Sequence, residues 1–308
     1  MPNWKIKAFI QGTLSRLPDA QRWNRLLQQY VSRSLTLEDD YLLTKWRQSA
    51  RHVLHYREHT GTVGPFVALE LGTGWFPINP IGLALAGASP VYTIDRQGLL
   101  RREQVLAVLD RFRKLLEQGL VEPVSDDAID RLRQILEASE DAPGATELLE
   151  RLGVHAIVGD ARATEFDTNS IDLICSNNTL EHIPEKTIEE IFQEFGRLLK
   201  PDGLMSHDID LADHYTNFDR SISVYNFLRF SDREWQRYNN DLQYQNRLRL
   251  SDYRALHERT GWRLVAEENL REPLEALRAL PLADQYRDYD ELDLAVYRSW
   301  LRSVPESS

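Results

Sequence analysis

The segment that most constrains the fold is a short apolar run that ends in closely spaced glycines. Residues 66–71 are almost entirely apolar and lead directly into Gly72, Thr73 and Gly74. A short continuous apolar run is typical of a parallel strand that is buried on both faces. Glycines directly after such a strand let the chain turn sharply and let a ligand approach the backbone, because they carry no Cβ. The sequence therefore predicts a first parallel strand whose carboxyl end faces a ligand.

Strand-like and helix-like patterns alternate through the rest of the chain. Apolar residues return at helical spacing in 78–86 and 186–199, and a further helix is predicted to begin near Ser251. The apolar runs that predict the other strands lie at 91–95, 155–159, 171–177, 203–210, 262–267 and 292–297. This alternation predicts an α/β protein with a Rossmann-like, doubly wound and mostly parallel sheet of seven strands.

The N-terminal part of the chain has a different pattern from the main domain that we place at 62–308. Apolar residues at three- and four-residue spacing predict an N-terminal helical cap over 1–61. Thr36 is expected to be a helix N-cap and Gly61 a helix stop.

Two segments of the main domain are predicted to lie outside the strand and helix alternation. Residues 99–152 are charged and leucine-rich, which predicts a helical insertion after the second strand. It would serve either as a substrate lid over the carboxyl edge of the sheet or as structural packing. Residues 211–250 favour a loop-and-helix substrate segment. The side chains that could line an acceptor pocket, or simply pack, are Tyr225, Phe227, Arg229, Phe230, Asn246, Arg247 and Arg249.

The charge of the chain disfavours nucleic acid as a partner. The formal net charge is −11, whereas affinity for nucleic acid comes largely from lysine and arginine. One basic stretch stands near the N-terminus, where a single acidic residue, Asp19, opposes several cations. This stretch has two interpretations. It is a solvated helical face, which is the simpler one, or it makes a weak peripheral contact with an anionic surface. Its basic residues are Lys5, Lys7, Arg16, Arg22, Arg25 and Arg33.

The use of cysteine and of apolar residues indicates a cytoplasmic protein. Cys175 is the only cysteine, so no disulfide and no cysteine-based metal site can form within the chain. No apolar stretch approaches the roughly 20 residues of a membrane span. We therefore expect a cytoplasmic protein without an integral membrane segment.

Acidic residues end two of the predicted strands. Asp95 follows the glycines by just over twenty residues, and a carboxylate there can accept hydrogen bonds from two vicinal ribose hydroxyls. Asp160 follows the next predicted strand. Pro77 stands where the dinucleotide fingerprint needs its third glycine, which disfavours a nicotinamide cofactor.

At these positions the sequence resembles the class I S-adenosylmethionine-dependent methyltransferases. Glu70, Gly72 and Gly74 match the first motif of that family, whereas Phe76 stands where many members have another glycine. The resemblance implies S-adenosylmethionine as cofactor, with the glycine turn, Thr73 included, near its methionine portion and Glu70 close by. It places Asp95 at the ribose. It also implies that Asp160 and Ala161 contact the adenine.

A later stretch strengthens the resemblance. Residues 172–183 are similar to the fourth strand of the family and its following turn, and 198–203 to the turn into the fifth strand. The resemblance makes Asn177 a cofactor-binding candidate and His182 a positional residue. Enzymes of the class that methylate base amines usually carry a Pro-Pro-aromatic signature after the fourth strand, which residues 176–179 lack. A nucleic-acid base is therefore disfavoured as acceptor.

Candidate catalytic residues cluster at 207–214. His207, Asp210 and His214 lie beside the expected cofactor site, so either histidine is a candidate base and Asp210 a candidate orienting group. On a strand, Asp208 and Asp210 share one face and His207 the other. A hard-metal site formed by these carboxylates and imidazoles is an alternative, but no recognised ligand spacing supports it and no metal ligand is assigned.

The sequence favours methyl transfer to a small polar acceptor, with a hydroxyl as the methylated group. Residues 206–214 and 246–253 resemble those of poorly characterised bacterial methyltransferases that accompany surface-polysaccharide synthesis, which implies a sugar as acceptor. A catalytically silent cofactor-binding scaffold is one alternative. An NAD or nucleotide-sugar enzyme on a related fold is the other.

Overall fold

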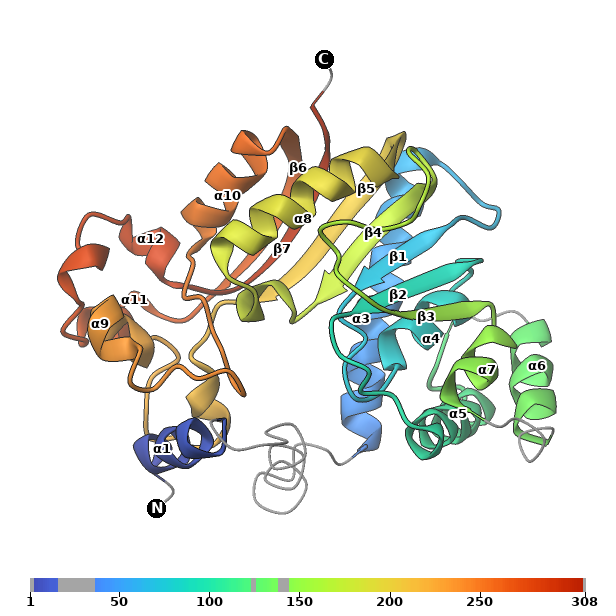
Figure 1. Ribbon diagram of the computed structural model, residues 1–308, viewed down its shortest axis with the longest axis horizontal. Coiled ribbons are helices and arrows are strands. Elements are labelled where there is room, and N and C mark those ends of the chain that lie inside the picture. The colour runs from blue at the N-terminus through green and yellow to red at the C-terminus, as the bar shows by residue number, and fades with distance from the viewer. Residues whose placement is uncertain (1–2, 16–36, 123–125, 138–143, 307–308) are drawn as a thin grey trace.

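The computed structural model describes residues 3–15, 37–122, 126–137 and 144–306. Its centre is a sheet of seven strands in the order β3-β2-β1-β4-β5-β7-β6 (Figure 1). The strands β1 to β5 pair in parallel, and β7 runs antiparallel to both of its neighbours. The mostly parallel Rossmann-like sheet is therefore confirmed. The strands are β1 (Ala68–Leu71), β2 (Val91–Asp95), β3 (Val154–Val158), β4 (Ile171–Asn177), β5 (Leu199–Asp210), β6 (Trp262–Arg271) and β7 (Val296–Pro305).

The prediction of the last strand was wrong in its position. Residues 292–297 were expected to be extended, but Glu291–Leu294 is the short helix α12 and β7 begins only at Val296. The cause is local, because the Asp290 side chain accepts hydrogen bonds from the backbone N–H groups of Leu292 and Asp293. Such an N-cap satisfies the free donors of a first helical turn.

Helices cover both faces of the sheet (Figure 1). On one face α3 (Asp39–Thr60) packs with β4 and β5, and α4 (Ile78–Leu85) packs with β1 and β2. On the other face lie α8 (Glu185–Leu198) and α10 (Leu250–Arg259). Strand β4 shows the division, because Leu173 and Cys175 belong to the first apolar core and Ile174 to the second. Alternate side chains of one strand thus enter opposite cores.

The connection from β2 to β3 is helical, and much of it is buried. It contains α5 (Arg102–Glu117), α6 (Asp126–Glu137) and α7 (Ala145–Glu150). Phe112 of α5 is fully buried, and its ring meets that of Trp46 in α3 edge-on at 6.2 Å between centroids. Helices α5 and α7 therefore pack as part of the first core.

The two described helices of the N-terminal region lie in different places. Helix α1 (Trp4–Leu14) packs on the segment after β5, where the Trp4 ring contacts Tyr215, Tyr238 and neighbouring aromatic rings at 4.8–6.4 Å between centroids. Helix α3 instead lies on the sheet and ends at Gly61, which has a left-handed φ of 72°. The predicted helix stop is confirmed, whereas Thr36 lies outside the described residues.

Candidate active site

The glycine turn after β1 is shaped by close packing at one glycine and by open space at the other. Gly72 has φ 96°, and a Cβ there would lie 2.4 Å from Thr179 Oγ1. Gly74 has φ 66°, yet a Cβ there would have no atom within 4 Å. At position 72 glycine is required both because a side chain would clash and because φ is positive. At position 74 only the positive φ favours glycine. The turn thus leaves room for a ligand beside Gly74.

The Asp95 carboxylate joins the end of β2 to the glycine turn. Its Oδ2 accepts a hydrogen bond from the Gly74 N–H at 2.9 Å, and its Oδ1 accepts from the Gln97 N–H at 2.9 Å. Each oxygen keeps a further lone pair, and the residue is half-buried. The residues present therefore fit a cofactor whose ribose hydroxyls donate to this carboxylate.

Glu70 is fully buried at the root of the turn. Its Oε2 accepts from the Thr93 hydroxyl at 2.8 Å, and Thr93 Oγ1 lies 2.6 Å from the hydroxyl of Thr73. Burial raises the pKa of Glu70 to about 7. Glu70 and Thr73 thus belong to one buried hydrogen-bonded chain that joins β1, the turn and β2.

Asp160 and Ala161 lie at the end of β3, as the sequence indicated. The Asp160 side chain is exposed, and hydrogen bonds from Arg162 hold its pKa down at about 2. The Gly159 N–H donates to the Asp95 carbonyl at 3.0 Å, which keeps the ends of β2 and β3 together. An adenine amine at Asp160 would share that carboxylate with Arg162.

Asn177 ends β4 and is held from helix α3. Its Oδ1 lies 3.1 Å from His52 Nε2, and His52 Nδ1 lies 2.8 Å from the hydroxyl of Ser206. The Trp300 N–H also donates to Ser206, at 2.8 Å. Asn177 is therefore part of a buried polar layer between α3 and the sheet, beside the glycine turn.

The same layer contains contacts that the sequence did not predict. Asp208 on β5 is buried, accepts from Gln48 of α3 at 2.8 Å and accepts two hydrogen bonds from Arg298 of β7 at 2.8 and 2.6 Å. The Lys45 ammonium donates to Asn178 Oδ1 at 2.9 Å. No sequence signal joins these residues, because their partners lie 90 or more positions away.

His207 lies on the opposite face of β5 from Asp208, as strand alternation requires. It is fully buried, its Nδ1 lies 2.7 Å from the Ser176 hydroxyl, and its ring stacks on Phe192 at 5.4 Å between centroids. Burial lowers the pKa of His207 well below its ordinary value. The structure therefore places His207 in the second core, away from Asp210 and His214.

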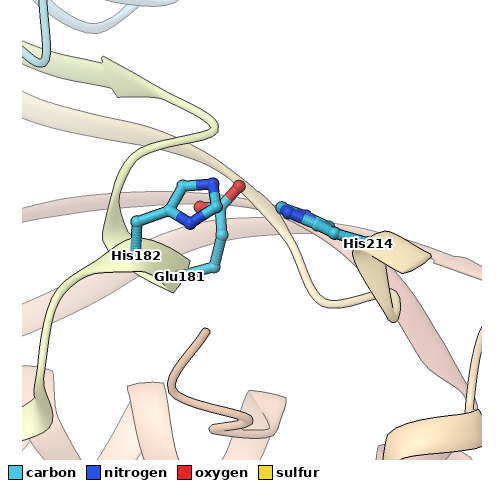
Figure 2. Close-up of side chains that lie close together, drawn as sticks. All are labelled: Glu181, His182 and His214. Atoms are coloured by element: carbon cyan, nitrogen blue, oxygen red, sulfur yellow. The ribbon is translucent and has the colours of Figure 1, made fainter. Parts of the chain in front are cut away.

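Asp210 and His214 do come together, and two further residues join them. His214 Nε2 lies 3.3 Å from Asp210 Oδ2. Burial alone would lower the pKa of His214, but the Asp210 carboxylate outweighs it and the pKa lies above its ordinary value. The His214 ring lies 4.9 Å from that of His182, and Figure 2 shows it pointing toward His182 and the Glu181 carboxylate. Burial raises the pKa of Glu181 to about 8.

Asn246 holds the turn that carries this cluster. Its Nδ2 donates to the Leu180 and Ile183 carbonyls at 2.8 and 2.9 Å, and its own N–H donates to the Glu181 carbonyl at 2.9 Å. Arg249, in contrast, is fully buried and donates to backbone carbonyls, among them that of Leu211 at 2.8 Å. Of the side chains proposed to line an acceptor pocket, these two instead bond to the backbone.

Comparison with known proteins gives one family match and several loose structural likenesses. Residues 125–203 match the sequence model of a family described as "Methyltransferase domain". No curated protein matches the chain. Geranyl diphosphate C-methyltransferase from Streptomyces coelicolor A3(2) is 13% identical, with a TM-score of 0.45 over 84% of this chain and 79% of that one.

Two other solved structures are similar at the same level. A putative sarcosine dimethylglycine methyltransferase from Galdieria sulphuraria is 14% identical, with a TM-score of 0.46 over 85% of each chain. The cyclase SpnF is 15% identical, with a TM-score of 0.44 over 84% of this chain and 81% of that one.

The family match covers strands β3 and β4 and helix α8. Strands β3 and β4 belong to the same sheet as the strands that carry the glycine turn and Asp95. Residues 125–203 thus match a methyltransferase domain within a Rossmann-like sheet. The family match supports a methyltransferase, and with it S-adenosylmethionine as the cofactor. In the part of the chain that the structure describes, no helix is both long and apolar enough to cross a bilayer.

Proposed function

We propose that the enzyme methylates a hydroxyl group of a small polar acceptor, with a sugar as the first class to test. One observation carries the proposal. The turn after β4 lies against the glycine turn, because Thr179 occupies the space that a Cβ on Gly72 would need. The same turn places His182 beside His214. Cofactor turn and polar cluster are thus joined by four consecutive residues, so an acceptor held at the cluster would lie beside the cofactor.

We propose that the cofactor is bound by the turn at 72–74, by Asp95 at the ribose, and by Asp160 and Ala161 at the adenine. Glu70 and Asn177 would support that site from their buried layers. When bound, S-adenosylmethionine supplies a methyl group from its sulfonium sulfur to an oxygen nucleophile and becomes S-adenosylhomocysteine, while the nucleophile loses its hydroxyl proton.

The residues of this chain that handle that proton are Asp210 and His214. The Asp210 carboxylate orients the imidazole and stabilises its charged form. We propose that the acceptor hydroxyl donates to this pair, which takes the proton as the methyl group is transferred and releases it to water. His207, buried in the second core, has no part in this step.

The test is transfer of a tritium-labelled methyl group to a panel of monosaccharides and oligosaccharides, with the product identified by NMR. We expect a methyl ether, and we expect His214→Gln to lower kcat about 100-fold or more with unchanged affinity for S-adenosylmethionine. His59→Gln, on the exposed end of α3, is the matched control. Cofactor binding without transfer to any hydroxyl acceptor, or full turnover by His214→Gln, would contradict the proposal.

A further inference from the structure

We propose that Glu181, His182 and His214 bind a divalent transition-metal ion, and that the hydroxyl oxygen of the acceptor coordinates to it. The role of the acceptor in this inference rests on the proposed function, whereas metal binding itself does not. Figure 2 shows that the three side chains converge from the turn after β4 and from the segment after β5.

The spacing of these side chains suits a single ion. Each offers one ligand atom, and the three atoms lie within 4.8 Å of one another. Nitrogen and oxygen ligands bind at about 2.1 Å, so two ligands of one ion lie up to about 4.2 Å apart. Small rotations of the side chains would therefore close the site around a metal.

Glu181 lacks the partner that a buried carboxylate needs. Its side chain is 1% exposed, and neither carboxylate oxygen has a hydrogen-bond partner in the described residues. Among the neighbouring cations, Lys45 donates to Asn178, Arg298 donates to Asp208, and the His214 ring lies 3.3 Å from the Asp210 carboxylate. Burying a carboxyl group without a partner is unfavourable in either protonation state. An ion at the cluster would supply the opposite charge.

The two histidines are oriented as metal ligands usually are. His182 Nδ1 lies 2.7 Å from the Tyr244 carbonyl. Because a carbonyl oxygen only accepts, Nδ1 carries the proton and Nε2 keeps a free lone pair. The Asp210 carboxylate lies 3.3 Å from the His214 ring. A carbonyl or carboxylate beside the imidazole is the common outer support of a metal-binding histidine.

The donor set indicates the kind of ion and what it would do. Two imidazoles and one carboxylate favour a transition metal such as Mn²⁺, Co²⁺ or Zn²⁺ and leave coordination positions for water or an acceptor oxygen. A bound ion lowers the pKa of a coordinated hydroxyl. With an ion bound, His214 would be a ligand and no longer the base. Asp210 alone would then accept the hydroxyl proton and release it to water, as the oxygen receives the methyl group.

Metal binding is tested directly on the full chain after treatment with EDTA. Mn²⁺ is titrated while the electron paramagnetic resonance signal of the free ion is followed, and Zn²⁺ is titrated by calorimetry. We expect one site per chain, and we expect Glu181→Gln and His214→Ala each to weaken it at least tenfold. Glu58→Gln and His59→Ala, on the exposed end of α3, are the matched controls and should bind as the original chain does. Thermal unfolding without metal confirms that each variant is folded.

The outcomes separate this inference from the proposed function. No binding by the original chain, or equal binding by the folded Glu181→Gln variant, overturns the metal site. Methyl ether formation that persists unchanged in EDTA overturns the role of the ion and leaves the proposed function standing. Metal binding at the cluster without transfer to any hydroxyl supports the site and overturns the proposed function.

Discussion

Replacing Gly72 by alanine should destabilise the fold far more than the same change at Gly74. A Cβ on Gly72 would lie 2.4 Å from Thr179 Oγ1 and 2.7 Å from its Cγ2, at a φ of 96° that side chains rarely adopt. Backbone strain of about 1–3 kcal/mol and overpacking of about 1–3 kcal/mol give a loss of roughly 2–6 kcal/mol. Gly74→Ala meets no atom within 4 Å, so its only cost is that of a left-handed alanine, about 1–2 kcal/mol.

A second substitution isolates the contact from the backbone strain. Thr179→Ala removes Oγ1 and Cγ2, the two atoms nearest to the Cβ of an alanine at position 72. The Cβ of residue 179 remains, 3.1 Å from that atom. In a double-mutant cycle followed by urea unfolding, it should recover about 1 kcal/mol or more of the loss caused by Gly72→Ala. Equal losses for the two glycine variants, or no recovery with Thr179→Ala, would refute this account of the turn.

Three further changes test other parts of the account. Asp95→Ala should weaken binding of S-adenosylmethionine by about 1–3 kcal/mol through loss of charge-assisted hydrogen bonds, and unchanged affinity in calorimetry would remove Asp95 from the site. The pKa of Glu70 is about 7 in the folded protein and 4.5 ordinarily. Between these two pH values the folded state binds a proton that the unfolded state has lost, so the free energy of unfolding should fall as the pH rises from 4.5 to 7. Glu70→Gln should reduce the slope of the unfolding free energy against pH in this range. An unchanged slope would show that Glu70 is not protonated in the folded protein. Asp208→Asn should destabilise the protein by about 3 kcal/mol, because it leaves Arg298 without its buried carboxylate, and a change below about 0.5 kcal/mol in urea unfolding would contradict that reading.

The strands around the cofactor could be predicted from the sequence because their signals are local. The segments 91–95 and 171–177 were expected to be strands and form β2 and β4 with those same bounds. Each is a short apolar run, and the turn residues that follow are adjacent in the chain. The closing strand was misplaced because the Asp290 side chain favours a helical turn where apolar residues had indicated a strand.

The polar cluster could be predicted only in part. Glu181 and His182 are adjacent in the sequence, and His214 lies in the dense stretch of ionisable residues after the fifth strand. Their meeting depends on the parallel pairing of β4 with β5, which brings Asn177 opposite Asp208. Strand alternation predicted that His207 and Asp208 lie on opposite faces of the strand. No local pattern indicated that Phe192 would cover His207.

The measurement that tests the central claim most directly is calorimetric titration of the full chain with S-adenosylmethionine, S-adenosylhomocysteine and NAD in parallel. We predict that the first two bind one site per chain with micromolar affinity and that NAD does not bind. Binding of NAD alone would contradict the account, because it would mean that the turn from Gly72 to Pro77 holds a dinucleotide.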